Sequence, residues 1–201
     1  MVEGLRERKK QRTRQALIEA ALRLFQEKGF EETTLAEIAE QADVSTRTFF
    51  SYFASKEDVV FYDTAARREL ALRVMEGRRP DETVTDVLMR IVEESFEQAV
   101  SYQDISSEDA VLRVRLILTE PALQARALLL LFDTQLKLAE ALHEAFPELT
   151  LVDAAAAVGG LIGAVKLGVM ATLEEEQSLG DILANARRAA EVAISGLHTL
   201  G

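Results

Sequence analysis

The chain has 201 residues, of which 48 % are hydrophobic, so it is long enough to bury one sizeable core or to divide into a small and a larger domain. It contains no cysteine and only two histidines, which excludes disulfides and thiolate metal sites and argues against a zinc site. Neither His143 nor His198 belongs to a recognisable catalytic arrangement. We therefore expect no metal, no cofactor and no catalytic residues.

The net charge of −11 is unevenly distributed. Residues 1–14 hold six of the 23 Lys and Arg residues but only two of the 34 Asp and Glu residues. Phosphate binding requires local positive charge, so this basic N-terminal arm is either a solvated tail or a contact to DNA. The N-terminus has no apolar core of signal-peptide type, and no apolar run reaches about 18 residues, so we expect a cytoplasmic protein without a membrane partner.

The first predicted helix covers about residues 8–28. Its apolar residues recur at intervals of three and four, which is typical of an amphipathic helix: Leu17, Ala20, Ala21, Leu24 and Phe25. Gly29 follows directly, where a left-handed residue commonly ends a helix.

The next segment predicts a helix-turn-helix. Thr34 and Glu37 have the spacing of a capping box and predict a second helix of about two turns. Asp43 and Val44 form a turn, and Ser45 is placed to cap a third helix over residues 46–53.

The remainder of the chain is also helical. Ser55 and Asp58 predict the start of a fourth helix that runs to about Met75. Proline positions and further cap signals predict five more helices over residues 82–101, 108–119, 121–145, 151–175 and 179–198. The predicted fold is all-α, with a domain of three small helices at residues 1–55 and a larger helical bundle at residues 56–201.

The aromatic residues of the third helix are predicted to be mostly core. Phe49 and Phe53 fall on one side of that helix, facing the first two helices. The remaining residues are short hydroxyls, one arginine and one tyrosine: Ser45, Thr46, Arg47, Thr48, Ser51 and Tyr52. Such a set fits a recognition helix in a major groove, and it fits a solvated helix face equally well.

The run GFEETTLAEIAEQADVSTRTFFSYFASKEDV, residues 29–59, closely resembles the N-terminal DNA-binding domain of the TetR family of bacterial transcriptional regulators. Six short motifs fall at the family's spacing: Gly-aromatic, Thr-Thr, Ile-Ala, Val-Ser, Tyr-Phe and Ser-Lys-Glu. The resemblance covers about the first 60 residues, whereas the rest is similar only in being a helical bundle of suitable length.

The resemblance implies a set of DNA contacts. Thr46 and Arg47 are expected at base edges, while Ser45, Thr48 and Tyr52 are expected at phosphates. Lys56 is expected at a further phosphate, and Thr33 and Thr34 at the start of the second helix. Two residues depart from the family pattern: Phe50 replaces a common tyrosine, and Asp43 replaces a common turn glycine.

A stripe of small residues marks the penultimate predicted helix: Ala155, Ala156, Gly159, Gly160 and Gly163. Glycine within a helix costs about 1 kcal/mol relative to alanine, so a close packing partner should offset it. The resemblance implies a homodimer formed by the last two helices. Tight packing within one subunit, or room for a ligand, would explain the same stripe.

The middle helices predict an effector site. Arg113 and Arg115 interrupt an otherwise apolar helix at angles about 160° apart, so both cannot face water. By projection Arg115 should point into the bundle, where it needs an anionic partner. That partner is either an acidic side chain (Glu108, Glu120 or Asp133) or the carboxylate or phosphate of a ligand. The apolar part of such a ligand would lie against Phe96, Leu116, Leu128 and Phe132.

The sequence therefore predicts a ligand-responsive transcriptional regulator, and specifically a repressor. It would bind a palindromic double-stranded DNA operator as a homodimer and be released by a small-molecule effector. An all-α enzyme and a helical adaptor or membrane-surface protein are the alternatives, weakened by the missing catalytic constellation and by the acidic amphipathic faces.

Overall fold

A computed structural model describes residues 2–101, 107–172 and 178–196. Within these ranges the chain forms helices and no strand, which confirms the predicted all-α class. The ten helices are α1 (Val2–Lys28), α2 (Leu35–Gln41), α3 (Thr46–Phe50), α4 (Lys56–Val60), α5 (Thr64–Glu76), α6 (Val84–Ser101), α7 (Ser107–Thr119), α8 (Pro121–Ala145), α9 (Leu151–Thr172) and α10 (Leu179–Gly196).

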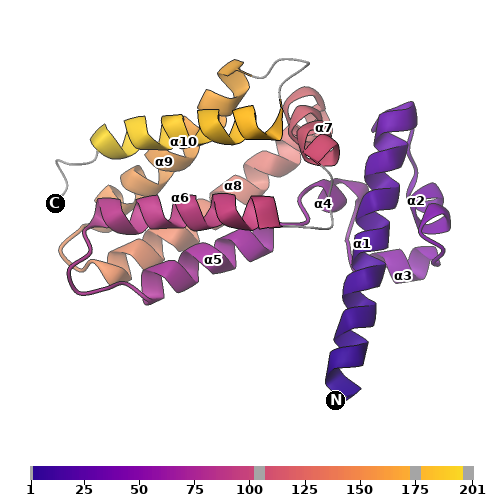
Figure 1. The fold of residues 1–201 in the computed structure, drawn as a ribbon, viewed down its shortest axis with the longest axis horizontal. Coiled ribbons are helices and arrows are strands. Elements are labelled where there is room, and N and C mark those ends of the chain that lie inside the picture. The colour runs from indigo at the N-terminus through magenta and orange to yellow at the C-terminus, as the bar shows by residue number, and fades with distance from the viewer. Residues whose placement is uncertain (1, 102–106, 173–177, 197–201) are drawn as a thin grey trace. The chain divides into compact units, whose positions relative to one another are not determined.

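The helices group into two compact units (Figure 1). The N-terminal unit comprises Met1–Tyr62 and Asp104–Ala127, and in it α1 packs against α2, α4 and α7. The C-terminal unit comprises Asp63–Gln103 and Leu128–Gly201, and in it α9 packs along α10 while α5 and α10 both contact α6. Helix α7 and the first part of α8 thus group with the N-terminal helices. The predicted division between residues 55 and 56 instead assigns them to the C-terminal domain.

Local capping explains where at least five of the ten helices begin. Thr34 and Glu37 form the predicted capping box of α2, and the hydroxyls of Ser45 and Ser55 accept from backbone N–H groups at the starts of α3 and α4. Reciprocal Thr150–Asp153 and Ser178–Asp181 bonds precede α9 and α10. These caps confirm the predicted helix starts.

Three predicted boundaries are wrong. Helix α1 begins at Val2 instead of near residue 8, because its first turns consist mainly of good helix formers and Gln11 bonds to Glu7 at 3.0 Å. Helix α3 ends at Phe50, where Ser51 bonds back to the Thr48 carbonyl at 2.6 Å.

The predicted fourth helix is in fact two helices. A turn over residues 61–63 separates α4 from α5, and α5 begins after Asp63, whose side chain makes no cap bond but pairs with Arg67 at 2.7 Å. The boundary between the two units falls at the same place, after Tyr62. Helical periodicity continues across this turn, so the pattern of apolar residues alone does not reveal it.

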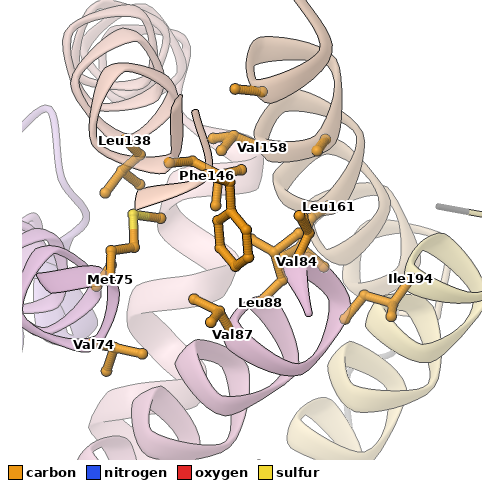
Figure 2. Packing of buried hydrophobic residues seen from close by; sticks show 14 of the residues in the cluster. Val74, Met75, Val84, Val87, Leu88, Leu138, Phe146, Val158, Leu161 and Ile194 are labelled. Atoms are coloured by element: carbon orange, nitrogen blue, oxygen red, sulfur yellow. The ribbon is translucent and has the colours of Figure 1, made fainter. Parts of the chain in front are cut away.

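The core of the C-terminal unit is drawn from α5, α6, α9, α10 and the end of α8 (Figure 2). Phe146 is 1 % exposed and stands among Leu88, Val158 and Leu161. Burial of large apolar side chains of this kind contributes roughly 1.5–3 kcal/mol each, which makes this cluster the principal source of the unit's stability.

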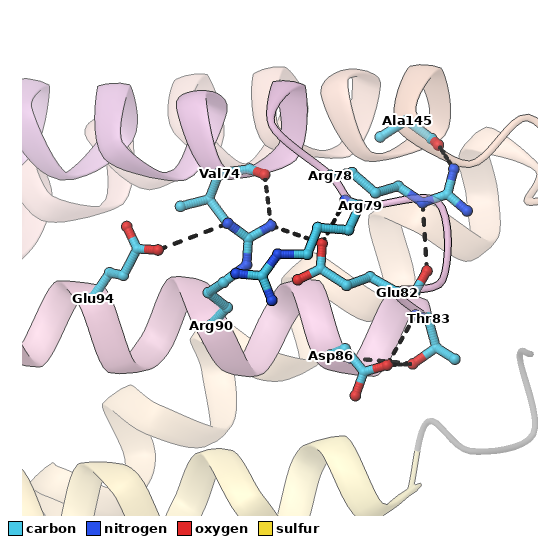
Figure 3. Close-up of polar contacts among 9 residues, drawn as sticks. All are labelled: Val74, Arg78, Arg79, Glu82, Thr83, Asp86, Arg90, Glu94 and Ala145. Atoms are coloured by element: carbon cyan, nitrogen blue, oxygen red, sulfur yellow. Dashed lines mark hydrogen bonds and ion pairs between the residues drawn. The ribbon is translucent and has the colours of Figure 1, made fainter.

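A polar network fixes the connection between α5 and α6 (Figure 3). Arg90 donates to the Val74 carbonyl at 3.2 Å and to Glu82 at 2.9 Å, and Arg78 donates to the Ala145 carbonyl at 2.8 Å. The backbone N–H of Arg79, followed by Arg90, holds the pKa of Glu82 below its usual range. The network satisfies carbonyls at the ends of α5 and α8.

Helix α9 corrects one sequence expectation. By length and composition, Leu151–Ala171 is apolar enough to cross a membrane, with a mean hydropathy of 1.8, although no such run was expected. Core helices pass the same test, and α9 supplies Ala154, Ala157 and Val158 to the core. Only 22 % of this window is buried, and the rest of this apolar helix is exposed or half-buried within the single chain.

Candidate DNA-binding surface

The N-terminal end of α3 presents polar side chains to solvent. Ser45, Thr46 and Arg47 are exposed, and Thr48 is half-buried. The Ser45 hydroxyl accepts from the Thr48 backbone N–H at 3.1 Å and lies 2.9 Å from the Thr48 hydroxyl. The cap fixes the first turn of α3, so Thr46 and Arg47 project from a defined backbone.

The aromatic residues behind this surface are buried as predicted. Phe49 is 0 % and Phe53 6 % exposed, with ring centroids 5.8 Å apart. Arg14 of α1 lies over the Phe53 ring at 5.4 Å and donates to the Tyr62 carbonyl. These two contacts join α1 to the residues that follow α3 and α4. Phe50 is 56 % exposed and has no hydroxyl to offer a phosphate.

The two threonines before α2 occupy different environments. Thr33 is 1 % exposed, and its hydroxyl donates to the Gly29 carbonyl at 2.8 Å. Thr34 is exposed and caps α2, while Lys28 donates to Glu37 at 2.5 Å. Lys28 and then Thr34 lower the pKa of Glu37 to about 2. Thr34 thus lies at the surface with its hydroxyl bonded to Glu37, whereas the Thr33 hydroxyl is used inside the fold.

Lys56 is placed differently from the expectation of a free phosphate ligand. Its ammonium group donates to the carbonyls of Phe30, Glu31 and Thr33 at 2.8, 3.2 and 3.2 Å. It also lies 4.4 Å from the centroid of the Phe30 ring. Tyr52, another expected phosphate contact, is half-buried.

The turn between α2 and α3 is acidic. Asp43 has φ of 52°, the left-handed conformation that glycine adopts most easily, and aspartate tolerates it better than most residues. A shallow cavity of about 410 Å³ opens beside it, lined by Ala36, Ala39, Glu40, Asp43, Val44, Ser45 and Thr46. Two carboxylates therefore flank the start of α3.

The basic arm is helical, not a disordered tail. Residues 4–12 of α1 are all exposed, and Figure 1 shows this half of α1 extending past α3 within the N-terminal unit. Its exposed cations are Arg6, Arg8, Lys9, Lys10 and Arg12. The arm thus displays positive charge beyond the helix-turn-helix.

The predicted effector residues have dissimilar environments. Leu116 is 7 % exposed and Arg115 half-buried, both in the N-terminal unit. Phe96 packs partly against the core of the C-terminal unit, while Leu128 and Phe132 are 52 % and 65 % exposed. Their grouping around a ligand stays a prediction.

Sequence reasoning missed the polar contacts that hold α4. Arg126 of α8 donates to Asp58 at 2.7 and 2.8 Å, and the Arg113 guanidinium lies 4.8 Å from the Tyr62 ring centroid. These partners are about 50 to 70 positions apart along the chain, so no local spacing rule reveals them.

The exposed face of α9 carries the small-residue stripe. Val152, Gly163 and Met170 fall within about 20° of one line along the helix, and the exposed fractions of Val152 and Met170 are 76 % and 48 %. A Cβ built at Gly159, Gly160 or Gly163 would meet nothing within 4 Å. A Cβ at Gly168 would lie 2.5 Å from the Ala189 Cβ, so only there does a glycine of α9 permit close packing on α10.

Comparisons with known proteins agree with the helix-turn-helix. The family model for bacterial regulatory proteins of the tetR family matches residues 17–62. The HTH-type transcriptional regulator TcmR of Streptomyces glaucescens is 49 % identical over 75 residues, which are 37 % of this chain and 33 % of TcmR. HbdR of an Aromatoleum species is 44 % identical over 48 residues, 24 % of this chain and 21 % of HbdR. The matched region thus spans a third or less of these curated relatives.

Solved structures extend the likeness of fold to nearly the whole chain. A TetR-family regulator from Mesorhizobium loti has a TM-score of 0.55 and 18 % identity, over 92 % of this chain and 96 % of that one. FadR of Bacillus subtilis, solved with stearoyl-CoA, has a TM-score of 0.54 and 21 % identity, over 91 % and 98 %. Residues 17–62 thus form a helix-turn-helix domain of the kind found in bacterial regulatory proteins of the tetR family.

Proposed function

We propose that the chain is a transcriptional regulator that binds double-stranded DNA through α3. The observation that supports this most directly is the exposed Thr46 and Arg47 pair at the capped start of α3, within the segment that matches the family model. Hydroxyl and guanidinium donors at the N-terminal end of a recognition helix read base edges in the major groove. Ser45, Thr48 and Tyr52 supply phosphate contacts in this proposal.

The basic arm adds sequence-independent affinity in this proposal. Its exposed cations neutralise phosphates, and each phosphate neutralised steepens the salt dependence of binding. The rest of the chain is acidic, since 32 of the 34 Asp and Glu residues follow residue 14. That charge repels DNA approaching any other surface, which favours one docking orientation.

We infer that the regulator acts as a homodimer through α9 and α10. The open glycines and the exposed Val152, Leu167 and Met170 give α9 a largely apolar exposed face, and a second copy would cover it. A two-fold dimer presents two copies of α3, so the proposed operator is a pseudo-palindrome with one α3 in each half-site.

We further propose that a small-molecule effector releases the protein from its operator, which would make it a repressor. The FadR structure from Bacillus subtilis holds stearoyl-CoA, and at 21 % identity that likeness concerns the fold alone. For this chain we therefore propose only the chemical class of the effector, which is a largely apolar small molecule. Such a ligand shifts the equilibrium only if it binds the DNA-released conformation more tightly than the DNA-bound one. A regulator of this kind works in the cytoplasm, binds no membrane and catalyses no reaction.

A mobility-shift titration tests the DNA proposal. The probe is the DNA immediately upstream of the protein's own gene, and unrelated DNA of equal length is the control. We expect the protein to retard the upstream probe at a concentration at least ten times lower than the concentration that retards the control probe. Equal retention of both probes by the wild-type protein would leave only non-specific binding and would reject the proposed regulator.

A further inference from the structure

The Lys56 ammonium is fully occupied inside the N-terminal unit. A lysine ammonium has three N–H donors, and three carbonyls lie within hydrogen-bond distance: those of Phe30, Glu31 and Thr33, at 2.8, 3.2 and 3.2 Å. The Phe30 ring adds a cation–π contact at 4.4 Å. No donor is left over for a phosphate oxygen while these bonds are made.

The position of Lys56 on its helix explains why it turns toward carbonyls. Lys56 is the first residue of α4, immediately after the capping residue Ser55. The start of a helix carries partial positive charge, so a lysine there is unfavourable unless acceptors compensate it. The turn between α1 and α2 supplies those acceptors, since its carbonyls are outside any helix.

The bonded turn leads directly into α2. Phe30 and Thr33 are each 1 % exposed, and Thr33 bonds back to Gly29, whose φ of 91° reverses the chain after α1. The next residue, Thr34, caps α2. A change in this turn therefore moves the first residue of α2 and its cap.

We propose that Lys56 is a positioning residue: it fixes the turn of residues 30–33 and thereby places the N-terminal end of α2, instead of binding a phosphate itself. The DNA part of this inference rests on the proposed function, and the stability part does not. Loss of the ammonium group leaves the carbonyls of Glu31 and Thr33 to water and the Phe30 carbonyl with the Thr33 N–H alone. The turn loosens, so both folding and the presentation of Thr34 suffer.

The test compares lysines with the same side chain in opposite settings. Lys56→Met removes the ammonium group from the carbonyls, and Lys10→Met removes one from the exposed arm. We expect Lys56→Met to lower the melting temperature by roughly 2–6 °C and Lys10→Met to leave it unchanged. Amide exchange at Glu37, whose N–H the Thr34 hydroxyl accepts, should be faster in Lys56→Met only. An unchanged melting temperature with unchanged exchange would overturn the inference, whether or not the protein binds DNA.

Salt dependence separates positioning from phosphate binding. Loss of a phosphate ligand lowers the slope of log K against log salt by about 0.9, whereas loss of a positioning residue weakens binding at every salt concentration alike. We expect a 3- to 10-fold loss of operator affinity in Lys56→Met with an unchanged slope. A slope lower by about one unit would show that Lys56 binds a phosphate.

Two further variants guard against misfolding and indirect effects. Lys56→Gln keeps two donors without charge, so it should keep the wild-type slope and lose less stability than Lys56→Met; a slope as reduced as that of a lost phosphate contact would contradict the inference. If Lys56 acts through the start of α2, its effect on affinity should shrink in a Thr34→Ala background. Fully additive losses in this double-mutant cycle would reject the coupling.

Discussion

The exposed surfaces of α3 and α9 differ in almost every physical respect. The start of α3 shows hydroxyls and a guanidinium on a capped turn, beside two carboxylates. The face of α9 shows Val152, Leu167 and Met170, separated by glycines whose missing side chains leave open space. A polar surface that is locally fixed suits a charged, hydrogen-bonding partner such as DNA, whereas an open apolar face suits another protein surface.

The glycines of α9 also differ in their surroundings. Gly168 is required within the chain, because a Cβ there would lie 2.5 Å from Ala189. Gly163 has no such neighbour. Glycine content alone therefore does not distinguish packing inside a subunit from packing between subunits, but the structure around each glycine does.

The largest expected effect comes from Gly163→Leu. A Cβ at this position meets nothing within 4 Å, and leucine favours a helix over glycine by about 1 kcal/mol, so the subunit should fold with unchanged or higher stability. It would push apart a second copy of α9, giving monomer and about a 100-fold or greater loss of operator affinity. Sedimentation equilibrium measures the oligomeric state. A variant that stays dimeric and binds DNA normally would show that α9 is not part of the interface.

Arg47→Ala tests the polar surface. Arg47 is exposed, so truncation should leave the melting temperature unchanged. A bidentate arginine–guanine contact discriminates by about 1–3 kcal/mol, so affinity should fall roughly 5- to 150-fold and discrimination should relax at particular base pairs. Titration of single-base operator variants checks this, and an unchanged preference at every position would show that Arg47 reads no base.

Gly168→Ala is the matched opposite of the Gly163 change. The added methyl collides with Ala189, so α9 and α10 must separate and the free energy of unfolding should fall by about 1–3 kcal/mol. Denaturant unfolding of both variants at equal concentration makes the comparison. Equal stability of Gly168→Ala and the wild type would contradict the close approach of α9 and α10.

Asp43→Asn isolates the charge beside α3. Asparagine adopts the left-handed conformation that Asp43 occupies at φ of 52°, so folding should be nearly unaffected. Removal of one negative charge near phosphates should raise affinity for operator and unrelated DNA alike, by roughly 2- to 10-fold at low salt. An unchanged affinity at low salt would place this carboxylate away from the DNA.

The smallest effect concerns the cap of α2. The pKa of Glu37 falls from 4.5 to about 2, because Lys28 and then Thr34 bond to the carboxylate. A lowered pKa in the folded state stabilises the protein above the unfolded pKa, and this contribution is lost as the pH falls from about 4.5 toward 2. Thermal melts across that range should show a shallower decline for Glu37→Gln than for the wild type. Parallel declines would mean that the carboxylate has an ordinary pKa.

The helix-turn-helix was predictable because its determinants are local. The Thr34–Glu37 capping box, the Ser45 cap and the burial of Phe49 all follow from short spacings in the sequence, and the structure confirms each of them. The left-handed Gly29 at the end of α1 is confirmed for the same reason.

Long-range contacts were not predictable in this way. The bonds from Lys56 to the carbonyls of the α1–α2 turn and the Arg126–Asp58 ion pair join residues far apart in sequence, so they depend on the packing of whole helices. The break between α4 and α5 was missed because apolar periodicity continues through the turn. The effector residues cannot be grouped by sequence for the same reason.

A hydroxyl-radical footprint on the DNA upstream of the gene tests the account most directly. Two α3 helices presented by an α9-mediated dimer predict two protected blocks related by two-fold symmetry, whose separation matches successive major grooves. Gly163→Leu should lose both blocks together at the concentration where the wild type protects fully. A single unsymmetrical block, unchanged by Gly163→Leu, would contradict a dimer that reads DNA with α3.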